Sequence, residues 1–145
     1  MSLPRILYCH CAYAQVVPKE VKDAVLHRLA EAGVAFEAVA DLCEMSARRD
    51  TALQRLANSG ELRFAACYPR AVKWLFAAAQ APLPAHAAEV LNMRVQSADD
   101  ILRSLLSSGP IQPNLPTGKG EPAAEPAKTP AELEPAPALA PTPST

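Results

Sequence analysis

Strand-like and helix-like segments alternate strictly along the first hundred or so residues of this 145-residue chain. Short apolar runs favour β-strands, and the stretches between them carry apolar residues at helical spacing. The apolar runs are residues 5–8, 34–39, 62–66 and 89–92. Strands separated by single helices pair in parallel through right-handed crossovers. The alternation therefore predicts one α/β domain with a four-stranded parallel sheet, in the order 2-1-3-4, and helices on both faces.

Residue types that begin or end helices fall where this arrangement needs them. Pro18 and Pro69 suit a first helical turn, where the missing N–H removes no hydrogen bond. Gly33 suits the left-handed position that follows a helix, while Ser46 and Ser97 are candidate N-caps. The predicted domain covers residues 1–108 and resembles a small flavodoxin-like domain.

Residues 109–145 have a different composition. Ten of the chain's 15 prolines lie there, together with Ala, Glu and Thr and very few branched apolar residues. Such a segment cannot bury enough apolar surface to offset the entropy lost on ordering. We expect a disordered, partly polyproline-like tail.

Charge and hydropathy exclude several classes of partner. Residues 1–108 contain 12 basic and 11 acidic side chains, so the domain lacks the basic stripe that nucleic-acid binding requires. No apolar run approaches the ~20 residues of a membrane span, and Met1 to Pro4 is too short for a secretory signal. We expect a cytoplasmic protein without a membrane span, and the oligomeric state stays open.

The chain has four cysteines, and each comes at or just after a predicted strand. Cys9 and Cys11 follow the first strand, Cys43 the second and Cys67 the third. The carboxyl ends of parallel strands meet at one edge of the sheet, where open α/β sheets bind ligands. Strands are ~4.8 Å apart, so loops from three neighbouring strands can bring four sulfur atoms around one small object.

Four thiolates at one sheet edge are typical of a metal site, and structural disulfides are rare in a reducing compartment. Iron–sulfur clusters commonly take four thiolate ligands. Structural zinc usually takes Cys-x2-4-Cys pairs, and Cys9 and Cys11 form the only close pair here. A thiol–disulfide couple is a third reading, although no Cys-x-x-Cys is present. Spacing alone does not separate [4Fe-4S] from [2Fe-2S].

Other side chains near these strand ends are candidates for contacts with such a group. His10 lies between two cysteines. Its possible roles are to donate a hydrogen bond to sulfur, to act as a further ligand, or to be only a loop residue beside the site. Tyr68 can shield the site from water, and Arg70 and Arg94 can offset negative charge. Helix N-termini are expected to point at the thiols and to lower their pKa, so that thiolates are available near pH 7.

Four short motifs, in order, resemble the N-terminal iron–sulfur domain of the flavin-carrying subunit of heterodisulfide reductases. The motifs are Cys9-His10-Cys11, Leu42-Cys43, Ala65-Ala66-Cys67-Tyr68-Pro69-Arg70 and Leu91-Asn92-Met93-Arg94. The family shows Cys-His-Cys, Met-Cys, Ala-Ala-Cys-Ser-Pro-Arg and Asn-Ile-Arg segments. This chain departs from it at Ala12, where a glycine is expected, and at Tyr68, where a serine is expected.

The resemblance implies a [4Fe-4S] cluster held by Cys9, Cys11, Cys43 and Cys67 in an electron-relay domain that works beside a flavin subunit. The chain has no Gly-x-Gly-x-x-Gly stretch, so we expect no bound flavin or nicotinamide and no catalytic residue. The expected function is non-catalytic electron transfer to or from a partner oxidoreductase. A zinc-stabilised binding module and a thiol-based redox protein are the alternatives.

Overall fold

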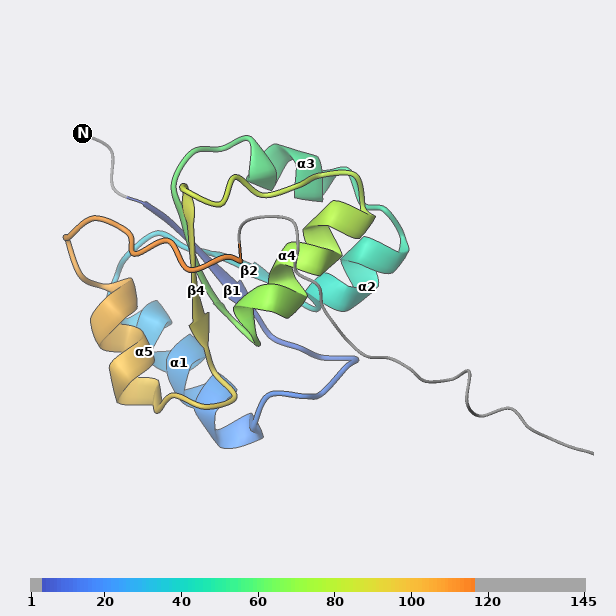
Figure 1. The fold of residues 1–145 in the computed structure, drawn as a ribbon. Helices are drawn as coiled ribbons and strands as arrows, with labels where there is room; N and C mark the ends of the chain where they lie inside the picture. Colours follow the sequence, from blue (N-terminus) through green and yellow to red (C-terminus); the bar gives the residue numbers. More distant parts are fainter. Residues whose placement is uncertain (1–3, 117–145) are drawn as a thin grey trace, which may run out of the picture.

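A computed structural model of the chain describes residues 4–116. It contains one four-stranded parallel sheet in the order β2-β1-β3-β4, which confirms the predicted architecture and strand order (Figure 1). The strands are β1 (Arg5–Cys9), β2 (Glu37–Val39), β3 (Leu62–Ala66) and β4 (Ala88–Asn92). The second strand is shorter than predicted, because residues 34–36 do not pair with β1.

Helices cover both faces of the sheet (Figure 1). One face carries α1 (Lys19–Glu31) and α5 (Ala98–Leu105), which pack against each other. The other face carries α2 (Leu42–Ala47), α3 (Ala52–Ala57) and α4 (Pro69–Ala78). The protein is therefore a three-layer domain with the sheet in the middle.

The core lies on both sides of the two central strands. Leu7 and Tyr8 of β1 and Phe64 of β3 are fully buried, as expected for central strands covered on both faces. The Phe64 ring meets the Phe76 ring of α4 edge-to-face, with centroids 5.6 Å apart, an arrangement that the aromatic quadrupoles favour. This packing fixes α4, and with it the Cys67 end of β3.

Most of the predicted helix signals operate as expected. Pro69 is the first residue of α4, and Gly33 takes a left-handed φ of 71° just after α1. Ser97 caps α5 by accepting a hydrogen bond from Asp100 N at 3.2 Å.

The predicted N-cap at Ser46 is wrong. Asp41 caps α2 instead, accepting hydrogen bonds from Cys43 N and Glu44 N. Ser46 lies inside that helix, and its hydroxyl donates to Leu75 O at 2.8 Å. As a result Cys43 belongs to the first turn of a helix rather than to a free loop.

The segment after α5 packs on the sheet beyond the predicted domain end at Ser108. The buried Arg63 pairs with Glu89 at 3.1 Å, and its guanidinium also donates to the carbonyls of Ser107, Gly109 and Pro110. The Asn114 side chain accepts from Val90 N at 3.0 Å and donates to Val90 O at 2.8 Å.

Two apolar side chains of this segment, Ile111 and Leu115, are also buried. Residues 109–116, which composition assigned to the tail, therefore complete the domain. Residues 117–145, the rest of the predicted tail, lie outside the described residues.

Within the part of the chain that the structure describes, no helix combines the length and the apolarity needed to cross a membrane.

Candidate metal centre

All four cysteines line one small pocket at the carboxyl ends of the strands. Val16, Val17, Asp41, Leu42, Ala66 and Leu75 complete its wall. The enclosed space is about 10 Å³, roughly enough for one water molecule. The topology thus gathers thiols from the end of β1 and the turn after it, from the first turn of α2 and from the residue after β3, at the sheet edge that the sequence predicts.

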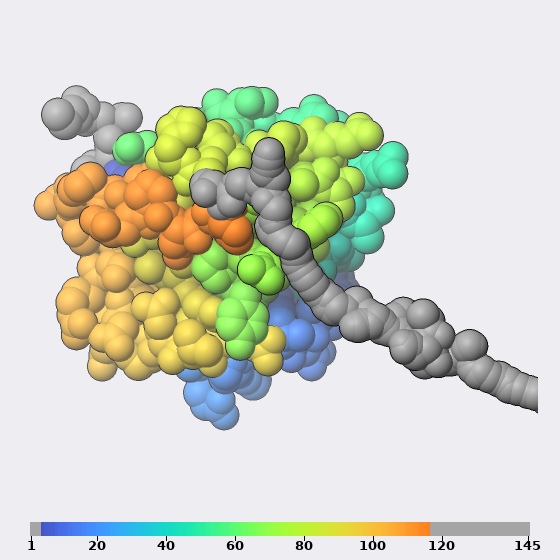
Figure 2. Space-filling model, in the orientation of Figure 1, coloured from blue at the N-terminus to red at the C-terminus, as the bar shows by residue number. Residues whose placement is uncertain are grey.

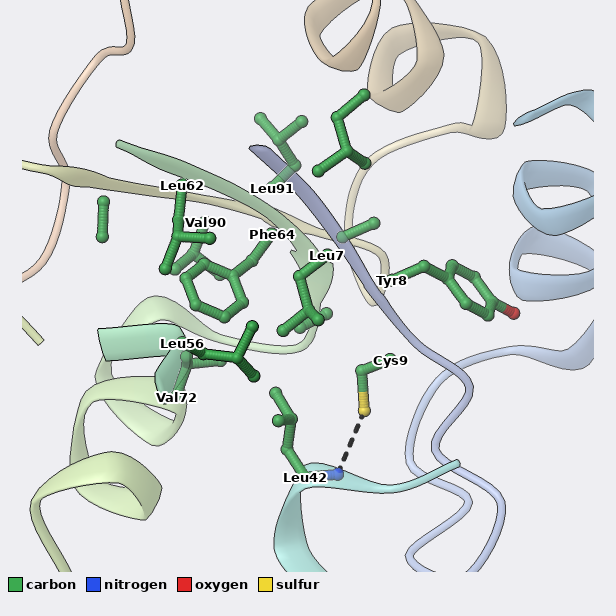
Figure 3. Packing of buried hydrophobic residues seen from close by; sticks show 14 of the residues in the cluster. Leu7, Tyr8, Cys9, Leu42, Leu56, Leu62, Phe64, Val72, Val90 and Leu91 are labelled. Carbon is green, nitrogen blue, oxygen red and sulfur yellow. Dashed lines mark hydrogen bonds between the residues drawn. The ribbon is translucent and has the colours of Figure 1, made fainter. Parts of the chain in front are cut away.

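Cys9 and Cys11 are the covered members of the set. The Cys9 sulfur accepts a hydrogen bond from Leu42 N at 3.4 Å (Figure 3). The Cys11 sulfur accepts one from Val16 N at 3.2 Å. Both residues are buried, so each thiol faces protein rather than bulk water.

Cys11 has an unusual backbone, with a left-handed φ of 55°. Non-glycine residues adopt this region rarely and at some cost in energy, and such residues cluster at functional sites. The turn is held by Gln15 N, which donates to Cys11 O at 3.1 Å, and by the buried Lys22, whose Nζ donates to the same carbonyl at 3.3 Å. The strained turn directs the Cys11 sulfur into the pocket.

Cys43 and Cys67 are the more accessible members. Cys43 is exposed on the first turn of α2, and Cys67 is half-buried directly after β3. Opening the pocket to a larger group therefore requires the least rearrangement on this side.

Asp41 is the residue that ties the site together. Its carboxylate is buried and accepts four backbone hydrogen bonds. Oδ1 accepts from Cys43 N and Glu44 N, and Oδ2 from Tyr13 N and Ala14 N. Burial raises the pKa of Asp41, but these N–H groups outweigh it, so the pKa lies below its usual range.

The sequence carries a local signal for the role of Asp41. Asp41 followed three residues later by Glu44 is the pattern of a helix N-terminus. The contribution of Lys22 has no local signal, since it depends on α1 packing beside the Cys11 turn.

The expected lowering of the thiol pKa is wrong for Cys9, Cys43 and Cys67. Burial, with further repulsion from Asp41, raises the pKa of Cys9 to about 11 and that of Cys43 to about 11. Burial also raises the pKa of Cys67, against the opposing effect of the Tyr68 N–H. Low-dielectric surroundings and neighbouring negative charges disfavour each thiolate more than the helix N-termini favour it.

Of the four predicted accessory residues, Tyr68 and Arg94 lie together beside Cys67. The Arg94 guanidinium stands over the Tyr68 ring, 5.0 Å from its centroid, a cation–π geometry. The positive charge of Arg94 is also one of the smaller influences that lower the pKa of Cys67, although burial dominates and raises it.

The structure does not bring His10 and Arg70 to the thiols. His10 Nδ1 is 2.8 Å from the Tyr8 hydroxyl, which also donates to Lys22 O on α1. Tyr8 points away from Cys9 toward α1 (Figure 3), and residues two apart on a strand share a face. Arg70 is exposed in the first turn of α4.

A larger cavity, of about 570 Å³, lies at the opposite edge of the sheet. Its walls are mainly apolar and include Val34, Phe36, Leu56 and Leu106. No cysteine lines it. The chemically reactive groups gather at the other edge, so the candidate site is placed at the thiols despite the smaller space there.

Among residues 4–116, no group of three or more His, Cys, Asp and Glu side chains converges closely enough to bind a single metal ion. Comparisons of the chain with protein-family models, with curated proteins and with solved structures give no match. The resemblance to heterodisulfide reductases therefore depends on the four motifs alone.

Proposed function

We propose that this domain binds one iron–sulfur cluster, of the [4Fe-4S] type, through Cys9, Cys11, Cys43 and Cys67, and that it relays electrons. The observation that carries the proposal is the single pocket lined by all four thiols. The choice of the four-iron type depends on the motif resemblance. The partner is a redox protein or a flavin subunit, in a reducing cytoplasm.

The arrangement of the sulfur atoms favours a cluster over a single ion. Ligands of one zinc ion must all lie about 2.3 Å from one point. Among the described residues, no group of three or more His, Cys, Asp and Glu side chains is arranged to hold a single ion. In a four-iron cluster each thiolate binds a different iron atom, so the sulfur atoms stay further apart. Making room requires Cys43 and Cys67 to turn outward, which their exposure allows.

The raised pKa values argue against the thiol-redox alternative. Redox-active cysteines act as thiolates and usually have a lowered pKa, whereas Cys9 and Cys43 have a pKa of about 11. Metal binding removes these protons, so thiols that are inert without metal are compatible with a ligand role.

The surrounding residues have definable roles toward the group. A bound cluster would supply a one-electron donor and acceptor. Leu42 N and Val16 N hydrogen-bond to sulfur, which stabilises negative charge on the ligands. Arg94 adds positive charge beside Cys67, and the apolar side chains of Val17 and Leu75 restrict water. Together these features set the reduction potential.

The decisive experiment is metal analysis of the full chain purified anaerobically, and reconstituted with iron and sulfide if it is isolated without metal. The proposal expects about four iron and four sulfide per chain, a thiolate-to-iron absorption band and an EPR signal on reduction. Zinc without acid-labile sulfide would support the binding-module alternative. A folded protein that retains neither metal nor cluster would reject the proposal.

Single Cys→Ser variants at the four positions should each lower the iron content. Ser46→Ala is a matched control, because Ser46 lies in the same helix as Cys43 and makes a buried hydrogen bond to Leu75 O. It perturbs the packing of α2 without removing a ligand. Iron loss in Ser46→Ala equal to that in Cys43→Ser would show that the assay reports folding and not ligation.

A further inference from the structure

Four apolar side chains are exposed in the segments that leave the thiol edge of the sheet. Tyr13 and Val16 follow β1, Tyr68 follows β3 and Val95 follows β4. Tyr13 is 70% exposed and Val95 67%. We call these four residues the thiol-edge patch. Single exposed apolar residues need no explanation, but four on three adjacent loops indicate an interaction surface.

The patch borders the thiols. Val16 lines the thiol pocket, and Tyr68 directly follows Cys67 in the chain. The segments after β3 and β4 also contact each other, since Arg94 after β4 stands over the Tyr68 ring. In Figure 2 the green segment after β3 protrudes beside the yellow segment after β4.

Two exposed cations lie at this edge beside the patch. Arg70 and Arg94 are exposed, and neither has a carboxylate within 4.0 Å among residues 4–116. Nearby acids are engaged with other groups. Asp41 is buried in backbone hydrogen bonds, and Glu44 pairs with Arg48. Asp99 and Asp100, in the first turn of α5, pair with Arg28 and Arg103.

Glu20 is an exposed acid in the first turn of α1, but it lies on the other face of the sheet from Arg70. Within residues 4–116, the patch is therefore apolar with two guanidinium groups at its side that make no ion pair.

We infer that the thiol-edge patch, with Arg70 and Arg94, is the docking surface for an acidic redox protein. The inference rests on the proposed function, because electron transfer needs the partner's redox centre close to the cluster. A partner bound to this patch would place its centre near Cys43, the exposed cysteine of the site. One electron then passes between the reduced and the oxidised centre, with no other reactant. Unpaired cations select an acidic surface, and the apolar side chains are buried on contact.

The test uses the full chain, with its iron and sulfide content measured first, and an oxidised plant-type ferredoxin as a small acidic probe. Binding is measured by titration calorimetry at low and high salt. The test variant combines Tyr13→Ser, Arg70→Glu and Val95→Ser, which leave Tyr68 and Arg94 beside the site intact. The control combines Val34→Ser and Arg5→Glu, an exposed apolar residue and a cation at the opposite edge of the sheet.

The inference expects the test variant to bind at least tenfold more weakly and the control to bind within twofold of the unaltered protein. Binding should also weaken with salt. Three outcomes would each overturn the inference. These are absence of binding, equal binding by the test variant and the unaltered protein, and self-association of this chain through the patch. Lack of iron and sulfide would reject the proposed function separately, since the binding assay reports the patch with or without metal.

Discussion

The Asp41 carboxylate accepts a hydrogen bond from the backbone N–H of Cys43 at 2.8 Å, while its other oxygen accepts from Tyr13 and Ala14 in the loop after Cys11. One buried side chain thus positions two of the segments that carry cysteines. Neither segment is fixed by the sheet ladder alone, so the geometry of the site depends on this carboxylate.

Replacing Asp41 with Asn should destabilise the domain by about 2–3 kcal/mol, because hydrogen bonds to a charged acceptor are lost and the amide NH2 faces backbone donors. Urea unfolding measures the change. Asp99→Asn, at an exposed carboxylate in the first turn of α5, should cost less than about 1 kcal/mol. Equal effects of the two substitutions would contradict the role given to Asp41.

The Cys43 thiol should react slowly in protein prepared without metal. With a pKa of about 11, the exposed Cys43 has about 100-fold less thiolate at neutral pH than a thiol with a pKa of 9.0. A thiolate with a higher pKa is also more nucleophilic, which offsets part of the loss in thiolate concentration. Alkylation of Cys43 should therefore be about tenfold slower than in the unfolded chain. Rates with iodoacetamide, followed by mass spectrometry from pH 7 to 11, provide the measurement.

The same pKa values give the pH dependence of stability without metal. Above pH 9 the unfolded chain loses thiol protons that the folded state keeps until about pH 11. The folded state then binds more protons, so the free energy of unfolding falls as the pH rises through this window. Stability that is constant from pH 8 to 11 would show that folding does not raise the pKa of these thiols.

Arg94→Gln should raise the pKa of Cys67 in the metal-free protein, because it removes a positive charge that lowers this pKa. If the cluster is present, the reduction potential should fall by about 20–60 mV, the scale of a partly screened charge. Spectroscopic redox titration measures it. Arg103→Gln, on an exposed cation of α5 paired with Asp100, should leave both quantities unchanged.

Arg63→Met should cost about 3–5 kcal/mol, because it leaves the buried Glu89 carboxylate without its partner. The double variant with Glu89→Gln should recover part of that loss. Thermal unfolding and proteolysis of the segment at residues 107–116 measure both effects.

Truncation gives an independent test of the same segment. Ending the chain after Ser108 removes the buried Ile111 and Leu115 and should lower the midpoint of thermal unfolding, whereas ending it after Pro116 keeps both. Equal stability of the two truncated proteins would show that the segment contributes little.

Local sequence patterns are enough to predict the secondary structure and the sheet topology of this domain. The alternation of strands and helices predicts the four strands, their order and the side of the sheet at which the cysteines meet. Which residue caps a helix depends on the hydrogen bonds that neighbouring candidates can make. Asp41, rather than Ser46, is the N-cap of α2, because its carboxylate accepts from two N–H groups of α2 and from two N–H groups of the loop after Cys11.

Features that depend on contacts distant in sequence are not predictable in the same way. Arg63 reaches the carbonyls of residues 107–110 across more than forty positions, and nothing in a proline-rich composition indicates that partner. The thiol pKa values are another case, since the burial that raises them arises only when α2, α4 and the Cys11 turn pack together.

The pair of hydrogen bonds between Asn114 and Val90 has a consequence for how copies of this protein can assemble. The amide group of Asn114 takes up the backbone N–H and carbonyl of Val90, in the middle of the outermost strand β4. These two groups of Val90 are therefore not free to pair with an incoming strand at the middle of β4, and the strand at the other border, β2, has only three residues. Growth by edge-to-edge strand addition is therefore disfavoured at both ends, which protects a small parallel sheet from aggregation.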